Sequence, residues 1–273
     1  MKSPFRCSIA AIAMLLTTAV MHAQSEPKQP ISPLKPPHRV LLQLDQVDPA
    51  QMSPGDSQVV ASRHEQLTSA VATAGFDLQQ GGWSYQQAVC PVLPSAVILQ
   101  YQMGAGTSQA SRFVAVIPRN TSDVRIVAVQ RNGNSPFTRS DANGNTIAIF
   151  NSLLSADGIN IYGPAMQEND GWVKLALCYA ELAGHHPTTL LTDTIYGESF
   201  DRNVSMPKRI YDKNGEFVLA FSDVNDPQST VNWNLNFDKT AHLSSVKVVP
   251  QKMNTPVRTQ KPITDIWPEK AAK

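Results

Sequence analysis

The sequence predicts an α+β protein in which an antiparallel sheet packs on a buried central helix and a C-terminal antiparallel β-meander follows. Three observations lead to this fold class. Residues 172–183 have the wide apolar surface of a buried helix, three apolar runs between positions 96 and 129 are typical of neighbouring strands, and residues 231–237 alternate between apolar side chains and asparagine. Helical and strand periodicities in separate stretches of one chain indicate an α+β fold.

Residues 172–183 are the predicted central helix. On a helical wheel they leave only a narrow polar stripe of Lys174 and Glu181, with Cys178 at its edge, and so apolar a helix is buried on nearly all sides. Gly184 fits the residue that stops the helix. A strand is the alternative, because larger and smaller side chains also alternate here, but the alanine and leucine content favours helix.

The N-terminus predicts a signal peptide at 1–23. Lys2 and Arg6 precede an apolar run at 9–20, and Ala23 is a small residue that permits cleavage. The apolar run is too short to span a membrane as a helix. We therefore expect a periplasmic or secreted protein with no transmembrane segment after cleavage. A linker rich in proline follows at 24–37.

The charge of the mature chain excludes partners that are attracted by a strong field. Loss of Lys2 and Arg6 leaves 21 basic residues against 22 acidic ones. A nearly neutral protein has little long-range attraction for nucleic acid or anionic membranes, so neither is expected as a partner.

We expect an α+β unit at 38–187, a β-meander at 188–250 that either shares its core or has its own, and a flexible tail at 251–273. In the first unit the sequence predicts a strand at 40–44, a helix at 58–74 capped by Asp56 or Ser57 and ended by Gly75, a loop at 79–83, and strands at 96–103, 112–117 and 124–129. Residues 146–154 fit a helix better than a strand.

The meander is predicted from turn signals and alternation. A hairpin at 209–219 turns at Asn214-Gly215, the strand at 231–237 follows, and a further strand runs from 242 to 249.

Two cysteines remain after cleavage, Cys90 and Cys178. In an oxidising compartment pairing is the expected state, and closing a loop of 88 positions stabilises a fold by about 4 kcal/mol in the chain-entropy model. A reactive thiol is the alternative, but it needs a cationic setting, and the residues next to Cys90 are apolar.

Candidate metal ligands gather after the central helix, at Glu181, His185 and His186. A zinc site needs three or four ligands, and the two-histidine helix motif of zinc proteases is absent. Histidines near a helix C-terminus are also favourable without a metal. We expect no metal and no other cofactor.

Two short strings resemble parts of catalytic motifs but lack their partners. Ser205 and Lys208 match the Ser-x-x-Lys string of penicillin-binding enzymes, yet they lead into a hairpin and the companion motifs are missing. Gly104 and Gly106 lack the third glycine and the following helix of a phosphate-binding loop.

Asn232, Asn234 and Asn236 are the candidate binding residues. Asparagine disfavours strands, so three at alternating positions suggest a role for that sheet face, such as binding a glycan or a protein through side-chain amides. A solvated sheet face is the alternative.

The expected function is a non-catalytic binding or structural protein of the cell envelope or extracellular space. The alternative is a secreted hydrolase that acts on wall or extracellular polymer through carboxylates. Its candidate acids are Asp141, Asp157, Glu168 and Asp170.

Overall fold

The computed structural model describes residues 39–105, 110–131, 140–161, 163–167, 170–192, 207–211, 214–224 and 229–252, all within one compact unit, Pro37–Lys273. The predicted signal peptide, the linker, Glu168, Ser205 and Gly106 lie outside the described residues, as do the tail beyond 252 and the side chain of Asp141.

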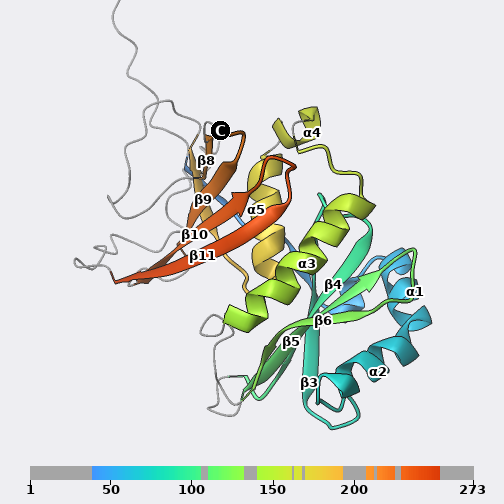
Figure 1. The fold of residues 1–273 in the computed structure, drawn as a ribbon. Coiled ribbons are helices and arrows are strands. Elements are labelled where there is room, and N and C mark those ends of the chain that lie inside the picture. Colours follow the sequence, from blue (N-terminus) through green and yellow to red (C-terminus); the bar gives the residue numbers. More distant parts are fainter. Residues whose placement is uncertain are drawn as a thin grey trace, which may run out of the picture. The chain divides into compact units, whose positions relative to one another are not determined.

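The α+β fold is confirmed (Figure 1). A five-stranded antiparallel sheet, in the order β2-β3-β4-β5-β6, forms the first half. The elements of this half are β1 (Arg39–Leu42), β2 (Gln46–Val47), the short 3-10 helix η1 (Pro49–Gln51), α1 (Pro54–Ser62), α2 (His64–Thr73), β3 (Trp83–Ala88), β4 (Ala96–Met103), β5 (Ser111–Pro118) and β6 (Arg125–Gln130).

In the described residues, the second half contains three helices and the predicted meander. Its four-stranded antiparallel sheet has the order β11-β10-β9-β8, and β7 pairs with β1 from the start of the chain. The elements are α3 (Ser140–Ala156), α4 (Pro164–Gln167), α5 (Gly171–Leu182), β7 (Thr189–Thr192), β8 (Lys208–Tyr211), β9 (Phe217–Asp223), β10 (Ser229–Phe237) and β11 (Leu243–Lys252). The helical interpretation of 146–154 is confirmed by α3.

The five-stranded sheet is covered on both faces because its strands are apolar on both. On one face, Leu67 and Val71 of α2 belong to a buried cluster with Leu99 and Phe113. On the other, Ile98 and other side chains of the same strands belong to the cluster that contains α3 and α5. Successive strand residues point to opposite faces, so adjacent residues of β4 enter different clusters.

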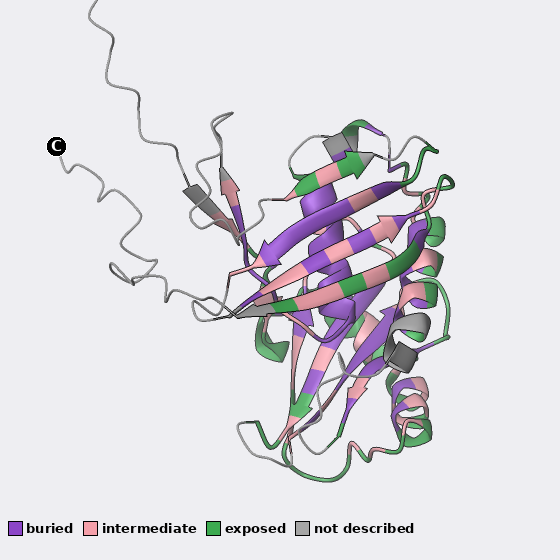
Figure 2. Ribbon diagram, turned by 60° about the vertical axis from the view of Figure 1, so that its left-hand side comes forward, coloured by how far each residue is buried: buried purple, intermediate pink, exposed green. Residues whose placement is uncertain are grey.

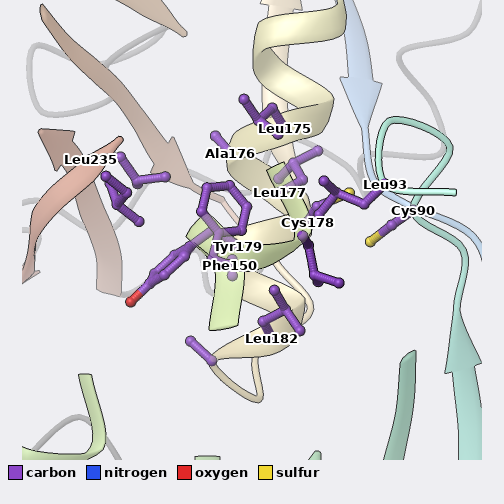
Figure 3. Close-up of a cluster of buried hydrophobic side chains, with 14 of the residues drawn as sticks. Cys90, Leu93, Phe150, Leu175, Ala176, Leu177, Cys178, Tyr179, Leu182 and Leu235 are labelled. Atoms are coloured by element: carbon purple, nitrogen blue, oxygen red, sulfur yellow. The ribbon is translucent and has the colours of Figure 1, made fainter. Parts of the chain in front are cut away.

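The helix α5 confirms the predicted central helix and is buried along its whole length. Leu175, Ala176, Leu177 and Leu182 are each 0% exposed. Figure 3 shows side chains of this helix surrounded by others from both halves, and Figure 2 shows the buried helix behind the four-stranded sheet. One buried cluster holds α5 together with inward side chains of that sheet, such as Leu219, Trp233, Leu235 and Phe237.

The end of α5 has the geometry of a Schellman motif. The backbone N–H of His185 donates to the carbonyl of Ala180 at 2.9 Å, and that of Gly184 donates to the carbonyl of Glu181 at 3.0 Å. Gly184 has φ +80°, which glycine adopts without strain. The predicted stop at Gly184 is therefore confirmed, and the turn directs the following residues back towards the helix end.

The predicted helix at 58–74 is wrong in its start and its continuity. Two helices, α1 and α2, meet at Arg63, and the N-cap is Ser53, whose Oγ accepts the backbone N–H of Asp56 at 3.1 Å. The physical reason is Pro54, whose fixed φ suits the first helical position and extends the helix upstream. Asp56 and Ser57 therefore do not cap it.

Removal of this cap has a modest expected cost. Ser53→Ala leaves the Asp56 N–H without its side-chain acceptor and should lower the free energy of unfolding by about 1 kcal/mol in a urea titration. Ser57→Ala, at the position where a cap was predicted, is the matched control and should change the value by less than about 0.5 kcal/mol. Equal losses for both variants would contradict the assignment.

The strand β3 was not predicted, because the string WSYQQA contains few apolar side chains. Its stability comes from pairing along β4, from Trp83 opposite Met103 to Ala88 opposite Ile98. The predicted loop at 79–83 is therefore one residue too long, because Trp83 begins the strand.

Candidate functional site

A polar pocket of about 270 Å³ lies where α5 ends over the five-stranded sheet. Ala96 and Ile98 of β4 face the apolar cluster around the helix. By the strand alternation, Gln100 and Gln102 continue the same face, and on β5 this face ends at Arg112. Because the helix stops at Leu182, this end of the sheet face is not covered by its apolar side chains.

The lining of the pocket is mostly polar and comes from both halves of the chain. The main polar side chains are those of Gln46, Gln86, Gln100, Gln102, Arg112, His185, His186 and Asp223. Apolar lining predominates in most ligand pockets, so this lining is unusually polar.

Glu181 holds three of these lining side chains in place. Its side chain is 0% exposed. Oε2 accepts the side-chain amides of Gln100 at 2.5 Å and Gln46 at 3.2 Å, and Oε1 accepts Nδ1 of His186. Gln100 also donates to the backbone carbonyl of Glu181 at 3.1 Å, so the helix end and β4 are joined twice.

Burial raises the pKa of the Glu181 carboxyl, while His186, Gln46 and Gln100 act in the opposite direction. The contact of Nδ1 with the carboxylate fixes the orientation of the His186 ring. The imidazole is 27% exposed, whereas Glu181 is inaccessible. Glu181 therefore orients groups in the pocket without lining it.

Arg112 is a half-buried cation without an acidic partner. Its Nε donates to Oε1 of Gln130, and it forms no ion pair with any residue in the described ranges. Burial lowers the pKa of the guanidinium, although arginine stays protonated at any physiological pH. A desolvated charge without compensation is unfavourable, so this arginine is a candidate for contact with a ligand.

His185 lines the pocket and also packs against a buried aromatic side chain of the core. Its ring lies 5.6 Å from that of Trp233 in an edge-to-face arrangement. Burial, followed by the charge of Arg112, lowers the pKa of His185 to about 3. The side chain is therefore neutral in the folded protein near neutral pH.

This neutral histidine predicts a loss of stability in acid. In the unfolded chain His185 is protonated below a pKa of about 6.5, whereas in the folded protein it stays neutral down to about pH 3. Because protonation then favours the unfolded chain, the free energy of unfolding falls as the pH drops from 6.5 to 3. Between pH 6.5 and 5 the expected contribution is about 2 kcal/mol. Urea titrations should show His185→Phe, which keeps a ring on Trp233, with a flatter pH dependence than the parent, and His64→Phe on exposed α2 is the matched control. An equal slope in all three would contradict the assignment.

Between Arg112 and the end of α5, the backbone of β6 packs closely against Gly184. Ala128 has φ 51°, an uncommon left-handed conformation for a residue with a side chain. A Cβ added to Gly184 would lie 3.2 Å from that of Ala128. The pairing of β5 with β6 shifts register between Arg112 and Val114. This irregularity places backbone close to the helix stop, and Gly184 allows the approach.

The structure joins only two of the three candidate metal ligands. Glu181 and His186 are in contact, whereas His185 packs on Trp233. No group of three or more histidine, cysteine, aspartate or glutamate residues suited to a metal occurs in the described parts of the chain.

The three asparagines lie on the face of β10 opposite the buried Trp233 and Leu235, and all are half-buried. Asn232 Oδ1 accepts Ser222 Oγ at 2.5 Å, and Asn236 Nδ2 donates to Ser245 Oγ at 3.0 Å. These two amides therefore link neighbouring strands.

The candidate hydrolase acids are not brought together in the pocket. Asp157 accepts the hydroxyl of Ser95 at 2.8 Å, and burial raises the pKa of its carboxyl. Asp170 is the residue before α5 and has φ 58°. Neither lines the pocket, and the side chains of Asp141 and Glu168 lie outside the described residues.

Sequence reasoning missed the residues that line the pocket beside His185 and His186. One signal was present, since Gln100 and Gln102 interrupt one face of an otherwise apolar strand. Gln46 and Arg112 had no such signal.

No protein-family model matches the chain, and neither the curated proteins nor the solved structures give a significant match. Among the helices of the described residues, none is long and apolar enough to cross a membrane.

Proposed function

We propose that this is an exported, non-catalytic binding protein that holds a small polar ligand in the pocket at the end of α5. The supporting observation is the preorganisation by Glu181, which fixes Gln46, Gln100 and His186 from behind the pocket wall. Side chains held by such bonds lose little freedom when a ligand arrives, so the cost of binding is reduced.

A pocket-filling variant tests this function. Gln102 is an exposed lining residue, and Gln102→Trp should occupy the pocket without disturbing the core. Gln80→Trp, in an exposed turn, is the matched control. A ligand-observed NMR screen of a library of amino acids, organic acids and sugars should give hits with the parent and the control that disappear with Gln102→Trp. If Gln102→Trp keeps every hit, the pocket is not the binding site.

The Glu181–His186 pair supports a second function, the hydrolase. A buried carboxylate in contact with Nδ1 of a histidine is the arrangement of a general base and its orienting group. The described pocket lining contains no serine, threonine or cysteine, so water would be the nucleophile. Mass spectrometry of a bound compound after incubation separates the functions, since a binding protein returns it intact and a hydrolase returns fragments.

We further infer that residues 1–23 are a signal peptide, that the protein is periplasmic or secreted, and that Cys90 and Cys178 form a disulfide there. Both thiols are free and buried in the structure, and the two cysteine side chains lie near each other (Figure 3). Burial, then Cys90, then Glu181 raise the pKa of the Cys178 thiol. An un-ionised buried thiol is a poor nucleophile, which favours a structural role.

A further inference from the structure

The charges in the pocket restrict its ligand. Arg112 supplies the positive charge, and the only side-chain hydrogen bond that it forms within the described chain uses Nε, so both terminal amino groups are available to a ligand. A guanidinium presents paired N–H groups that match the two oxygens of a carboxylate. Binding an anion would also compensate a charge that the fold has partly desolvated.

The remaining polar groups include acceptors from the other half of the chain. His186 lines the pocket with its ring held at Nδ1 by the buried carboxylate of Glu181. Asp223, at the end of β9, adds a carboxylate to the lining, and its Oδ1 accepts the backbone N–H of Thr188 at 3.1 Å. A second negative charge on the ligand would be repelled by this residue, whereas an ammonium or hydroxyl group would be attracted.

We propose that the pocket binds a small organic acid that carries a hydrogen-bond donor near its carboxylate, an amino acid or a hydroxy acid. The carboxylate pairs with Arg112, and the amino or hydroxyl group donates to Asp223. A cavity of about 270 Å³ lies at the small end of ligand pockets, so the ligand is a metabolite rather than a polymer. This proposal rests on the binding function proposed above.

Four compounds of equal size test the two halves of the proposal separately. L-Alanine has the carboxylate and an ammonium, L-lactate the carboxylate and a hydroxyl, propionate only the carboxylate, and L-alaninamide only the amine. Saturation-transfer NMR on the full chain at about 10 mM compound detects even millimolar dissociation constants. Alanine, lactate or both should bind, and whichever is tighter identifies the donor. Propionate and alaninamide should bind at least about tenfold more weakly.

Substitutions of arginine connect the binding to Arg112. Arg112→Met should weaken the binding acid by about tenfold to hundredfold, since a charge-assisted hydrogen bond is lost. Arg125→Met, which removes an exposed arginine paired with Asp123, is the matched control and should bind like the parent. Arg112→Lys keeps the charge and should bind with intermediate affinity, which remains informative if Arg112→Met folds poorly.

The proposal is overturned if alaninamide or propionate binds as tightly as alanine or lactate, or if none of the four compounds binds. It is also overturned if Arg112→Met and Arg112→Lys both bind like the parent. In those cases a library hit that Gln102→Trp abolishes would leave the binding function standing. The absence of any such hit would remove both proposals.

Discussion

Glu181→Ala is expected to lower the free energy of unfolding by about 4 kcal/mol. The carboxylate is 0% exposed and accepts hydrogen bonds from Gln46, Gln100 and His186. Truncation leaves those donors without their buried acceptor and adds a cavity beside the helix end, and each unsatisfied group costs about 1–3 kcal/mol. The measurement is a urea titration at neutral pH.

Two further variants give this experiment its controls. Glu65→Ala truncates a glutamate that is exposed to solvent on α2, and it should change the free energy of unfolding by less than about 0.5 kcal/mol. Glu181→Gln keeps one acceptor and the volume, so its loss should lie between the other two. A loss below about 1 kcal/mol for Glu181→Ala would show that the three lining side chains do not depend on it.

The proposed disulfide between Cys90 and Cys178 should contribute an effect of similar size. In the exported protein, Cys178→Ser is expected to lower the free energy of unfolding by about 4 kcal/mol, because the cross-link otherwise restricts the unfolded chain. Under reducing conditions the parent and the variant should differ far less, which separates the cross-link from the cost of a buried hydroxyl. Ligand affinity should stay nearly unchanged.

Mass spectrometry without reduction provides the direct check on the same proposal. A peptide that links Cys90 to Cys178 is the expected product from exported material. Free thiols at both positions would exclude the disulfide. A variant that loses ligand binding or turnover while its melting temperature is unchanged would instead indicate a functional thiol at Cys178.

The sequence pattern was sufficient to predict a helix or strand wherever the burial of consecutive residues follows a single period. Trp172 to Ala183 is apolar around the wheel and is a buried helix, and the alternation of 231–237 is a strand with Trp233, Leu235 and Phe237 facing the core. The N-cap of the first helix was harder to predict, because Ser53, Asp56 and Ser57 all suit this position and only Pro54 distinguishes among them.

The pairing of Glu181 with His186 shows where a local pattern becomes insufficient. Glu181 and His185 are four residues apart, so a continuous helix would place those two on one face. The Schellman turn at Gly184 instead directs His185 to Trp233 and returns His186 to the carboxylate. The stop itself was predictable, but the side-chain directions beyond it depend on packing against the two sheets.

By itself, the sequence determined the α+β class, the central helix with its stop, and most strands, because each of these follows from the burial pattern of consecutive residues. Only the tertiary structure decided the pocket. Gln46 lies 135 positions from Glu181 and Gln100 lies 81 positions away, and they meet because the order of strands β2-β3-β4-β5-β6 brings them under the end of α5. A hydrogen bond between such distant residues depends on how whole elements pack, and no spacing along the chain encodes it.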